Sequence, residues 1–136
     1  MHASNDTGCR YMQSFLAVGG GAALGAWLRW GLGLALNPVF GGFPLGTWVA
    51  NLVGGLLMGV ALAVFQSMPE LPPHLKLLCT TGFLGGLTTF SSFSGEVFAL
   101  LQRGDNVWAA AAIAAHVIGS LAMTALGWWA WQRLAA

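Results

Sequence analysis

The chain has 136 residues, of which 57% are hydrophobic and only 7% are charged, whereas about 25% charged residues is usual in soluble domains. Five basic and four acidic side chains are too few to cover a water-soluble domain of this size, but a lipid-facing protein needs no such cover. The formal net charge of +1 gives no electrostatic footprint for nucleic acid, and the length allows one domain.

The first 13 residues, MHASNDTGCRYMQ, are polar and lack the basic start and apolar core of a cleavable signal. We predict a disordered lead-in over residues 1–13 and a single transmembrane domain over residues 14–133. A helix that spans a bilayer needs about 20 mostly apolar residues. Four segments satisfy this requirement, namely residues 14–36, 45–67, 75–102 and 107–131.

Three short connections separate these segments, and they read NPVFGGFP, MPELPPH and RGDN. Loops this short make consecutive helices antiparallel neighbours, which predicts an up-down four-helix bundle with both termini on one side. Three of the Lys and Arg residues fall on the side of the termini and one or two on the other, which is a weak bias. The orientation is therefore not firmly specified, and a chain that inserts in both orientations stays open. Four thin helices enclose little interior, so we also predict self-association.

Glycines four residues apart occur in three of the predicted helices. Small residues at this spacing let helix backbones approach closely in lipid, so we predict tight helix packing at these positions. The run GGGAALG lacks the Gly-Lys-Ser/Thr ending of a phosphate-binding loop. The pairs are Gly21 and Gly25, Gly55 and Gly59, and Gly82 and Gly86.

Polar residues in the first two predicted helices are the next informative feature. Arg29 either holds loop carbonyls or snorkels, or it supplies positive potential to an ion path, in which case it favours an anion. Thr47 and Asn51 are four residues apart and share one face of the second helix. The Asn51 amide serves either an interhelical hydrogen bond or a ligand.

The third predicted helix contains GGLTTFSSFS over residues 85–94, with Glu96 after it on the same face as Ser92. Five hydroxyls beside several glycines favour a broken helix, which survives at membrane depth only inside protein or along a watery cavity. Freed carbonyls can bind a cation and freed N–H groups an anion. The edges of Phe90 and Phe93 would suit an anion.

The fourth predicted helix carries His116, Ser120 and Thr124 on one face. This stripe either lines water or another polar stripe, or it is satisfied by packing. No nucleophile–base–acid set and no metal-ligand spacing appears, so we do not expect an enzyme.

At these residues the sequence resembles the Fluc/CrcB family of fluoride channels, over about residues 15–131. The resemblance rests on GAALGAWLRW, GTWVANLVGG, TTGFLGGLTTFSSFS followed by Glu96, and HVIGSLAMTALG, one motif in each predicted helix. The chain departs from the family at Ser92, where Thr is common, and residues 1–13 match nothing in it. The role of His116 stays open because the family is expected to vary there.

The resemblance implies an all-α, multi-pass protein of the cell inner membrane that forms an antiparallel, dual-topology homodimer. Two pores, each using residues of both chains, would pass fluoride passively out of the cytoplasm. A structural sodium ion, which is not transported, would sit at the dimer centre on the backbone carbonyls of Gly85 and Thr88.

The resemblance also implies which side chains line the fluoride pathway. Phe90 and Phe93 would face fluoride with their ring edges, and Asn51 would donate its amide. The remaining predicted members are Thr47, Ser92 and Glu96 towards one mouth, Ser120 and Thr124 as a hydroxyl track, and Arg29.

Two other functions stay open on the sequence. A small dual-topology, proton-coupled multidrug exporter shares the length, the helix count and the ambiguous orientation. Such exporters carry a glutamate in their first helix, whereas residues 14–36 contain Arg29 and no acid. A non-transporting membrane subunit would bury the polar stripe of the third helix against another protein.

Overall fold

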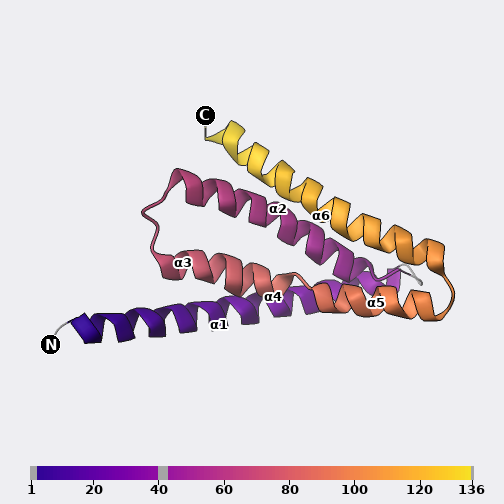
Figure 1. The fold of residues 1–136 in the computed structure, drawn as a ribbon, viewed down its shortest axis with the longest axis horizontal. Helices are drawn as coiled ribbons and strands as arrows, with labels where there is room; N and C mark the ends of the chain where they lie inside the picture. The colour runs from indigo at the N-terminus through magenta and orange to yellow at the C-terminus, as the bar shows by residue number, and fades with distance from the viewer. Residues whose placement is uncertain (1–2, 40–42, 136) are drawn as a thin grey trace.

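The structure, a computed structural model, describes residues 3–39 and 43–135, and every element in that part of the chain is helical. Figure 1 shows the helices as long rods lying side by side, with both termini at the same end as the α2–α3 connection. The predicted up-down order of four helices is confirmed. The elements are α1 (Ala3–Leu36), η1 (Asn37–Val39), α2 (Leu45–Ser67), α3 (Pro73–Leu77), η2 (Leu78–Leu84), α4 (Gly85–Leu87), α5 (Phe90–Gln102) and α6 (Asn106–Leu134).

The N-terminal boundary differs from the prediction. We expected residues 3–13 to belong to a disordered lead-in, but α1 begins at Ala3 and continues to Leu36. The side chains of residues 8–13 are exposed, so packing does not account for this part of the helix. Extending an existing helix adds one hydrogen bond for each residue that is fixed, and no proline interrupts residues 3–13. The prediction looked for apolar segments, so it could not detect a helical extension made of polar residues.

The third rod contains most of the irregular backbone. Its first part consists of α3, the π-helical segment η2 and α4, in that order. In a π-helix each hydrogen bond spans one residue more than in an α-helix. Thr88 and Thr89 then take extended conformations, with φ/ψ of −81°/156° and −150°/117°. The chain resumes as α5, which lies roughly in line with α4 in Figure 1.

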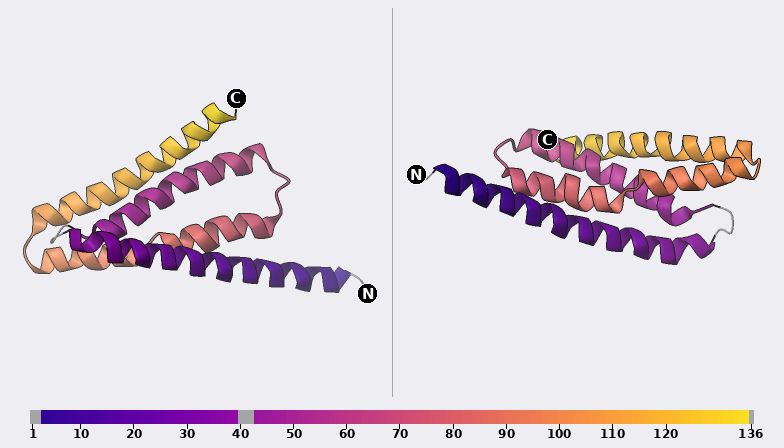
Figure 2. Two further views of the ribbon diagram at one scale, coloured as in Figure 1. Left: turned by 180° about the vertical axis from the view of Figure 1, so that it is seen from behind. Right: turned by 60° about the horizontal axis from the view of Figure 1, so that its bottom comes forward.

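Close glycine contacts join the rods in pairs. Figure 2 shows the pairs from two further directions, with α1 beside the third rod and α2 beside α6. A Cβ on Gly21 would lie 2.6 Å from the carbonyl oxygen of Leu78, so α1 meets η2 backbone to backbone. A Cβ on Gly55 would lie 2.8 Å from the carbonyl oxygen of Ser120, which places α2 equally close to α6. The predicted tight packing through glycine is confirmed.

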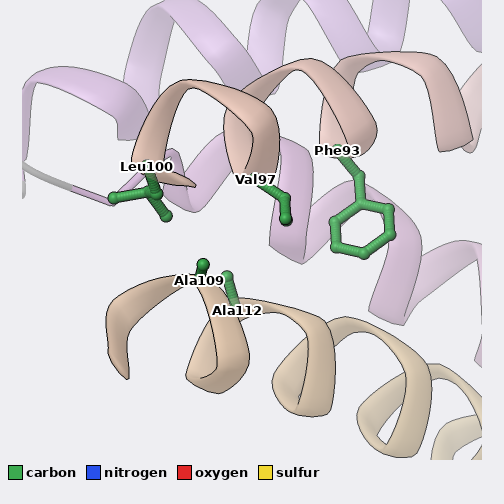
Figure 3. Packing of buried hydrophobic residues seen from close by; sticks show 5 residues of the cluster. All are labelled: Phe93, Val97, Leu100, Ala109 and Ala112. Atoms are coloured by element: carbon green, nitrogen blue, oxygen red, sulfur yellow. The ribbon is translucent and has the colours of Figure 1, made fainter. Parts of the chain in front are cut away.

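Two small apolar clusters lie in the interior of the described part of the chain. Figure 3 shows the first, in which Phe93, Val97 and Leu100 of α5 face Ala109 and Ala112 of α6. The small alanine side chains leave space for the larger side chains opposite them. This packing holds α5 against α6. The second cluster contains Ala50, Leu84 and Leu87, and it joins α2 to the third rod just before the extended residues.

Large apolar side chains cover much of the outer surface. Trp27 and Trp30 on α1 are each 67% exposed, and Leu121 on α6 is exposed to the same degree. Soluble monomers rarely display contiguous apolar surface on this scale. Of the described helices, α2 and α6 are each long and apolar enough to cross a membrane. The molecule is a helical membrane protein.

Candidate functional site

The extended residues of the third rod are held from the side by Asn51 of α2. The backbone N–H of Thr89 donates to Asn51 Oδ1 over 2.8 Å, and Asn51 Nδ2 donates to the carbonyl oxygen of Thr89 over 3.1 Å. Asn51 Nδ2 also donates to Nδ1 of His116 over 3.1 Å. Both amide hydrogens and the amide oxygen of Asn51 therefore have protein partners.

Thr89 is the N-cap of α5, and sequence reasoning did not single it out. Its Oγ1 accepts from the backbone N–H of Ser92 over 3.1 Å and donates to Ser92 Oγ over 3.1 Å. Oγ1 also lies 3.2 Å from Ser91 Oγ. A threonine directly before a helical run is a capping signal that the sequence does contain.

Arg29 acts on the other side of the interruption. Its Nε donates over 3.0 Å to the carbonyl oxygen of Gly86, which would accept from Phe90 N–H if the helix were continuous. The guanidinium group of α1 therefore satisfies a backbone carbonyl freed by the break. Of the two interpretations of Arg29, this contact matches the structural one.

Other backbone groups at the break remain without a partner among the described residues. The carbonyl oxygens of Gly85, Leu87 and Thr88 accept no hydrogen bond there, and the N–H groups of Phe90 and Ser91 donate none. Each helix end leaves such groups unpaired unless side chains or ligands satisfy them. The end of α4 thus presents partial negative charge and the start of α5 partial positive charge.

A pocket of about 350 Å³ lies beside the break, between α2, the third rod and α6. It contains most of the predicted pathway residues and is mainly apolar, with amide and hydroxyl groups on its walls. Such a lining can hold a small ion through a few polar contacts while excluding bulk water. The lining residues with polar or aromatic side chains are Asn51, Thr88, Thr89, Phe90, Phe93, His116, Ser120 and Thr124.

The two phenylalanines occupy different environments. Their ring centroids are 5.5 Å apart with planes at 69°, an edge-to-face arrangement. Phe93 is 7% exposed within the bundle, whereas Phe90 is 78% exposed on the open side of the pocket. The Phe93 ring is therefore packed within this chain, whereas no part of this chain covers most of the Phe90 ring.

His116 stands next to Phe93 on the α6 side. The two rings are stacked, with centroids 4.5 Å apart and planes at 27°. The imidazole is only 4% exposed and lines the 350 Å³ pocket together with a second one of about 200 Å³. Phe93 lines both as well, so the stacked pair lies where the two pockets adjoin.

The hydroxyl track on α6 is partly engaged by its own helix. Thr124 Oγ1 donates to the carbonyl oxygen of Ser120 over 2.9 Å, a back-bond of the kind that threonine often makes in membrane helices. Ser120 Oγ makes no hydrogen bond to a described residue. Ser120 is therefore the freer donor of the two.

The residues predicted towards one mouth lie outside the first pocket. Thr47 Oγ1 donates to Glu96 Oε1 over 2.6 Å, and Glu96 Oε2 is buried without a partner among the described residues. Glu96 lines the second pocket with Phe93 and His116. Arg29, Thr47 and Ser92 line a third hollow of about 500 Å³. The predicted set is thus spread over three adjoining spaces around the break.

The fold and the site together define a small helical membrane protein with an interrupted helix beside a polar pocket. The chain belongs to the CrcB family, because the family model described as "CrcB-like protein, Camphor Resistance (CrcB)" matches residues 16–128.

Curated relatives match over most of their length. A protein of Aromatoleum aromaticum named "Fluoride-specific ion channel FluC" is 61% identical over 117 residues, covering 86% of this chain and 89% of the relative. A protein of the same name from Pseudomonas putida is 56% identical over 116 residues, covering 85% of this chain and 91% of the relative. One from Cupriavidus metallidurans is 54% identical over 121 residues, covering 89% and 96%. These relatives are named as ion channels and not as enzymes.

Proposed function

We propose that the chain is a fluoride-selective channel that lets fluoride leave the cytoplasm passively. The observation that carries the proposal is the pocket beside the break, in a chain 61% identical to a relative named as a fluoride-specific ion channel. The pocket offers aromatic rings, hydroxyls and a nearby helix N-terminus, and no Lys or Arg lines it. An anion can therefore be admitted without being trapped by a fixed positive charge.

Selectivity follows from the size and chemistry of the path. Fluoride is small and accepts strong hydrogen bonds, so it can be passed between single donors along a mostly apolar wall. The donors we assign are the Asn51 amide, the hydroxyls of Ser120 and Thr124 and the ring edges of Phe90 and Phe93. Thr47, Ser92 and Glu96 are the polar groups that we place towards one mouth, and Arg29 completes the set. Since both hydrogens of Asn51 bond to protein here, its direct donation to fluoride requires one of those bonds to open.

We further propose an antiparallel homodimer in the cell inner membrane, each chain crossing it four times, with two pores. Two features of the single chain support this assembly. Phe90 is 78% exposed on the open side of its pocket, so a second copy would complete the wall. The weak bias in the distribution of Lys and Arg allows the two copies to insert in opposite orientations.

A structural sodium ion would sit where the two copies meet, on the carbonyls of Gly85 and Thr88. The residues fit such an ion, because oxygen ligands suit a hard cation and these carbonyl oxygens have no donor among the described residues. Gly85 is exposed, and a Cβ there would meet nothing of this chain closer than 3.5 Å. A neighbouring copy would therefore have access to its backbone. The ion would neutralise the carbonyl dipoles at the centre of the assembly.

The test is a flux assay with purified protein in liposomes, read by a fluoride electrode. We expect a fluoride gradient to collapse quickly and electrogenically once counter-ion movement is allowed, while a chloride gradient persists in matched vesicles. Equal chloride flux would contradict selectivity. Flux that requires a proton gradient and a cationic drug would instead support an exporter, and no flux of any kind would support a non-transporting subunit.

A further inference from the structure

The position of the protons around Asn51 can be worked out from the backbone. A peptide N–H can only donate, so the Asn51 atom that faces Thr89 N–H must be the amide oxygen. The other atom is then the NH₂ group, and it faces both Thr89 O and His116 Nδ1. The orientation of this amide is therefore fixed by its backbone partner.

The tautomer of His116 follows in turn. An amide NH₂ can only donate, so Nδ1 of His116 must direct a lone pair at it over the 3.1 Å contact. The ring is then neutral and carries its single proton on Nε2. An imidazolium would place a second N–H against the amide hydrogens and break the contact. Glu96 and Arg103 share the second pocket with His116, and neither forms a hydrogen bond with the ring.

The free N–H of this ring belongs to the wall shared by the two pockets. Nε2 makes no hydrogen bond to a described residue, and the ring lines both pockets. Phe93 and His116 are stacked with their centroids 4.5 Å apart and their planes at 27°, so the two rings are nearly parallel and neighbouring parts of their edges face the same side. An ion at that shared edge would meet the positive rim of Phe93 and the N–H of His116 together.

We propose that His116 is a further donor of the ion pathway: its Nε2–H, held in that tautomer by Asn51, binds fluoride as it passes between the two pockets. This inference rests on the proposed function. Asn51 is then a positioning residue, since it orients the donor of another side chain and keeps the ring neutral. The polar stripe of α6 accordingly extends from Thr124 through Ser120 to His116.

Two substitutions separate the roles of the ring nitrogens. His116→Gln places an amide near the position of Nε2 and keeps a donor there, whereas His116→Asn places its amide near Nδ1 and keeps only a partner for Asn51. We expect fluoride flux within about threefold of wild type for H116Q, and reduced by about tenfold or more for H116N, since a hydrogen bond to an ion is lost. His116→Phe keeps the stacked ring without either nitrogen and should resemble H116N.

A purely structural role for His116 predicts the reverse order, with H116N active and H116Q impaired, and that order would overturn the inference. Wild-type flux in H116F would overturn it equally. Wild-type protein without any fluoride flux would instead remove the proposed channel function itself. Size-exclusion profiles of the variants show whether the assembly is retained.

A second measurement does not depend on variants folding. Nitrogen-15 NMR of histidine-labelled wild-type protein in bilayers reports whether each ring nitrogen carries a proton, and H116Q identifies the signals against those of His2 and His74. We expect Nδ1 to be unprotonated and Nε2 protonated, and we expect the Nε2 signal to move when fluoride replaces chloride. A protonated Nδ1, or an Nε2 signal indifferent to fluoride, would overturn the inference.

Discussion

Asn51 and Thr89 are joined by two hydrogen bonds in which a side-chain amide completes the backbone of another helix. Thr89 donates its N–H over 2.8 Å and accepts from Asn51 Nδ2 over 3.1 Å. Lipid offers no replacement partner for either peptide group. The extended conformation of the third rod therefore depends on α2.

The first prediction concerns a substitution that removes the Asn51 hydrogen bonds to Thr89. Asn51→Leu leaves both peptide groups of Thr89 unpaired, and we expect a loss of about 1–3 kcal/mol of stability together with faster hydrogen exchange at the Thr89 amide. Thermal unfolding in detergent and exchange mass spectrometry measure the two effects. Ser67→Ala is the matched control on α2, because Ser67 is exposed and bonds only to Val64 O of its own helix. Equal stability of both variants would contradict the assignment.

The second prediction concerns how Arg29 acts. Glutamine carries its amide nitrogen the same number of atoms from the backbone as Arg29 Nε, so Arg29→Gln can still donate to Gly86 O without a charge. We expect Arg29→Gln to keep most of the thermal stability and Arg29→Met to lose about 1–2 kcal/mol. If Arg29→Gln were as unstable as Arg29→Met, the guanidinium charge would matter more than this hydrogen bond.

The third prediction tests the glycine contact between α1 and the third rod. A Cβ on Gly25 would lie 2.6 Å from the backbone nitrogen of Leu87, which cannot move aside without shifting α4. We expect Gly25→Ala to cost about 1–3 kcal/mol through overpacking. Gly31→Ala, on the same helix with nothing within 4 Å of its Cβ, should be neutral or slightly stabilising. Unfolding midpoints of the two variants provide the comparison, and equal midpoints would argue against a close contact.

The fourth prediction uses the difference in exposure between the two phenylalanines. Phe90 is 78% exposed in the single chain, so Phe90→Ile should change the stability of the single-chain fold by less than about 0.5 kcal/mol. We expect the same variant to lose most fluoride flux, because isoleucine has no positive ring edge. Phe93→Ile should lose flux and also some stability, since Phe93 is packed against α6. Wild-type flux in both variants would mean that the rings only pack.

The fifth prediction addresses the proposed sodium site. Replacing sodium with a large organic cation should weaken the dimer and reduce fluoride flux, as seen by size-exclusion chromatography and the electrode assay. Thr88→Val should not alter this dependence, because the proposed ligand is a carbonyl oxygen and the Thr88 hydroxyl bonds to Leu84 O. A dimer that is insensitive to sodium would exclude a structural ion there.

Helix positions were largely predictable because length and apolar composition decide them. The prediction for residues 45–67 coincides with α2, which lies between Pro44 and Met68. The N-terminal extension of α1 was missed, since propagation of a helix needs no apolar residues. The sequence also favoured irregular backbone within residues 85–94, and the extended residues are Thr88 and Thr89 rather than the glycines.

The partners of the polar residues were not predictable from spacing. Periodicity places Thr47 and Asn51 on one face of α2, but it does not say what that face meets. The contacts that matter cross long stretches of chain, from Asn51 to Thr89 and from Asn51 to His116. The orientation of the Asn51 amide could be assigned only by locating a peptide N–H opposite its oxygen.

The interruption at Thr88 and Thr89 also constrains how the protein is made. Residues 73–87 and 90–102 are each shorter than the roughly 20 residues that a helix needs to cross a bilayer alone. Their partners at the interruption, Arg29 and Asn51, lie earlier in the chain and are synthesised first. On the proposed topology, residues 73–102 would move from the insertion machinery into the bilayer only together with the first two helices. Biogenesis would then proceed through a three-helix unit and not helix by helix.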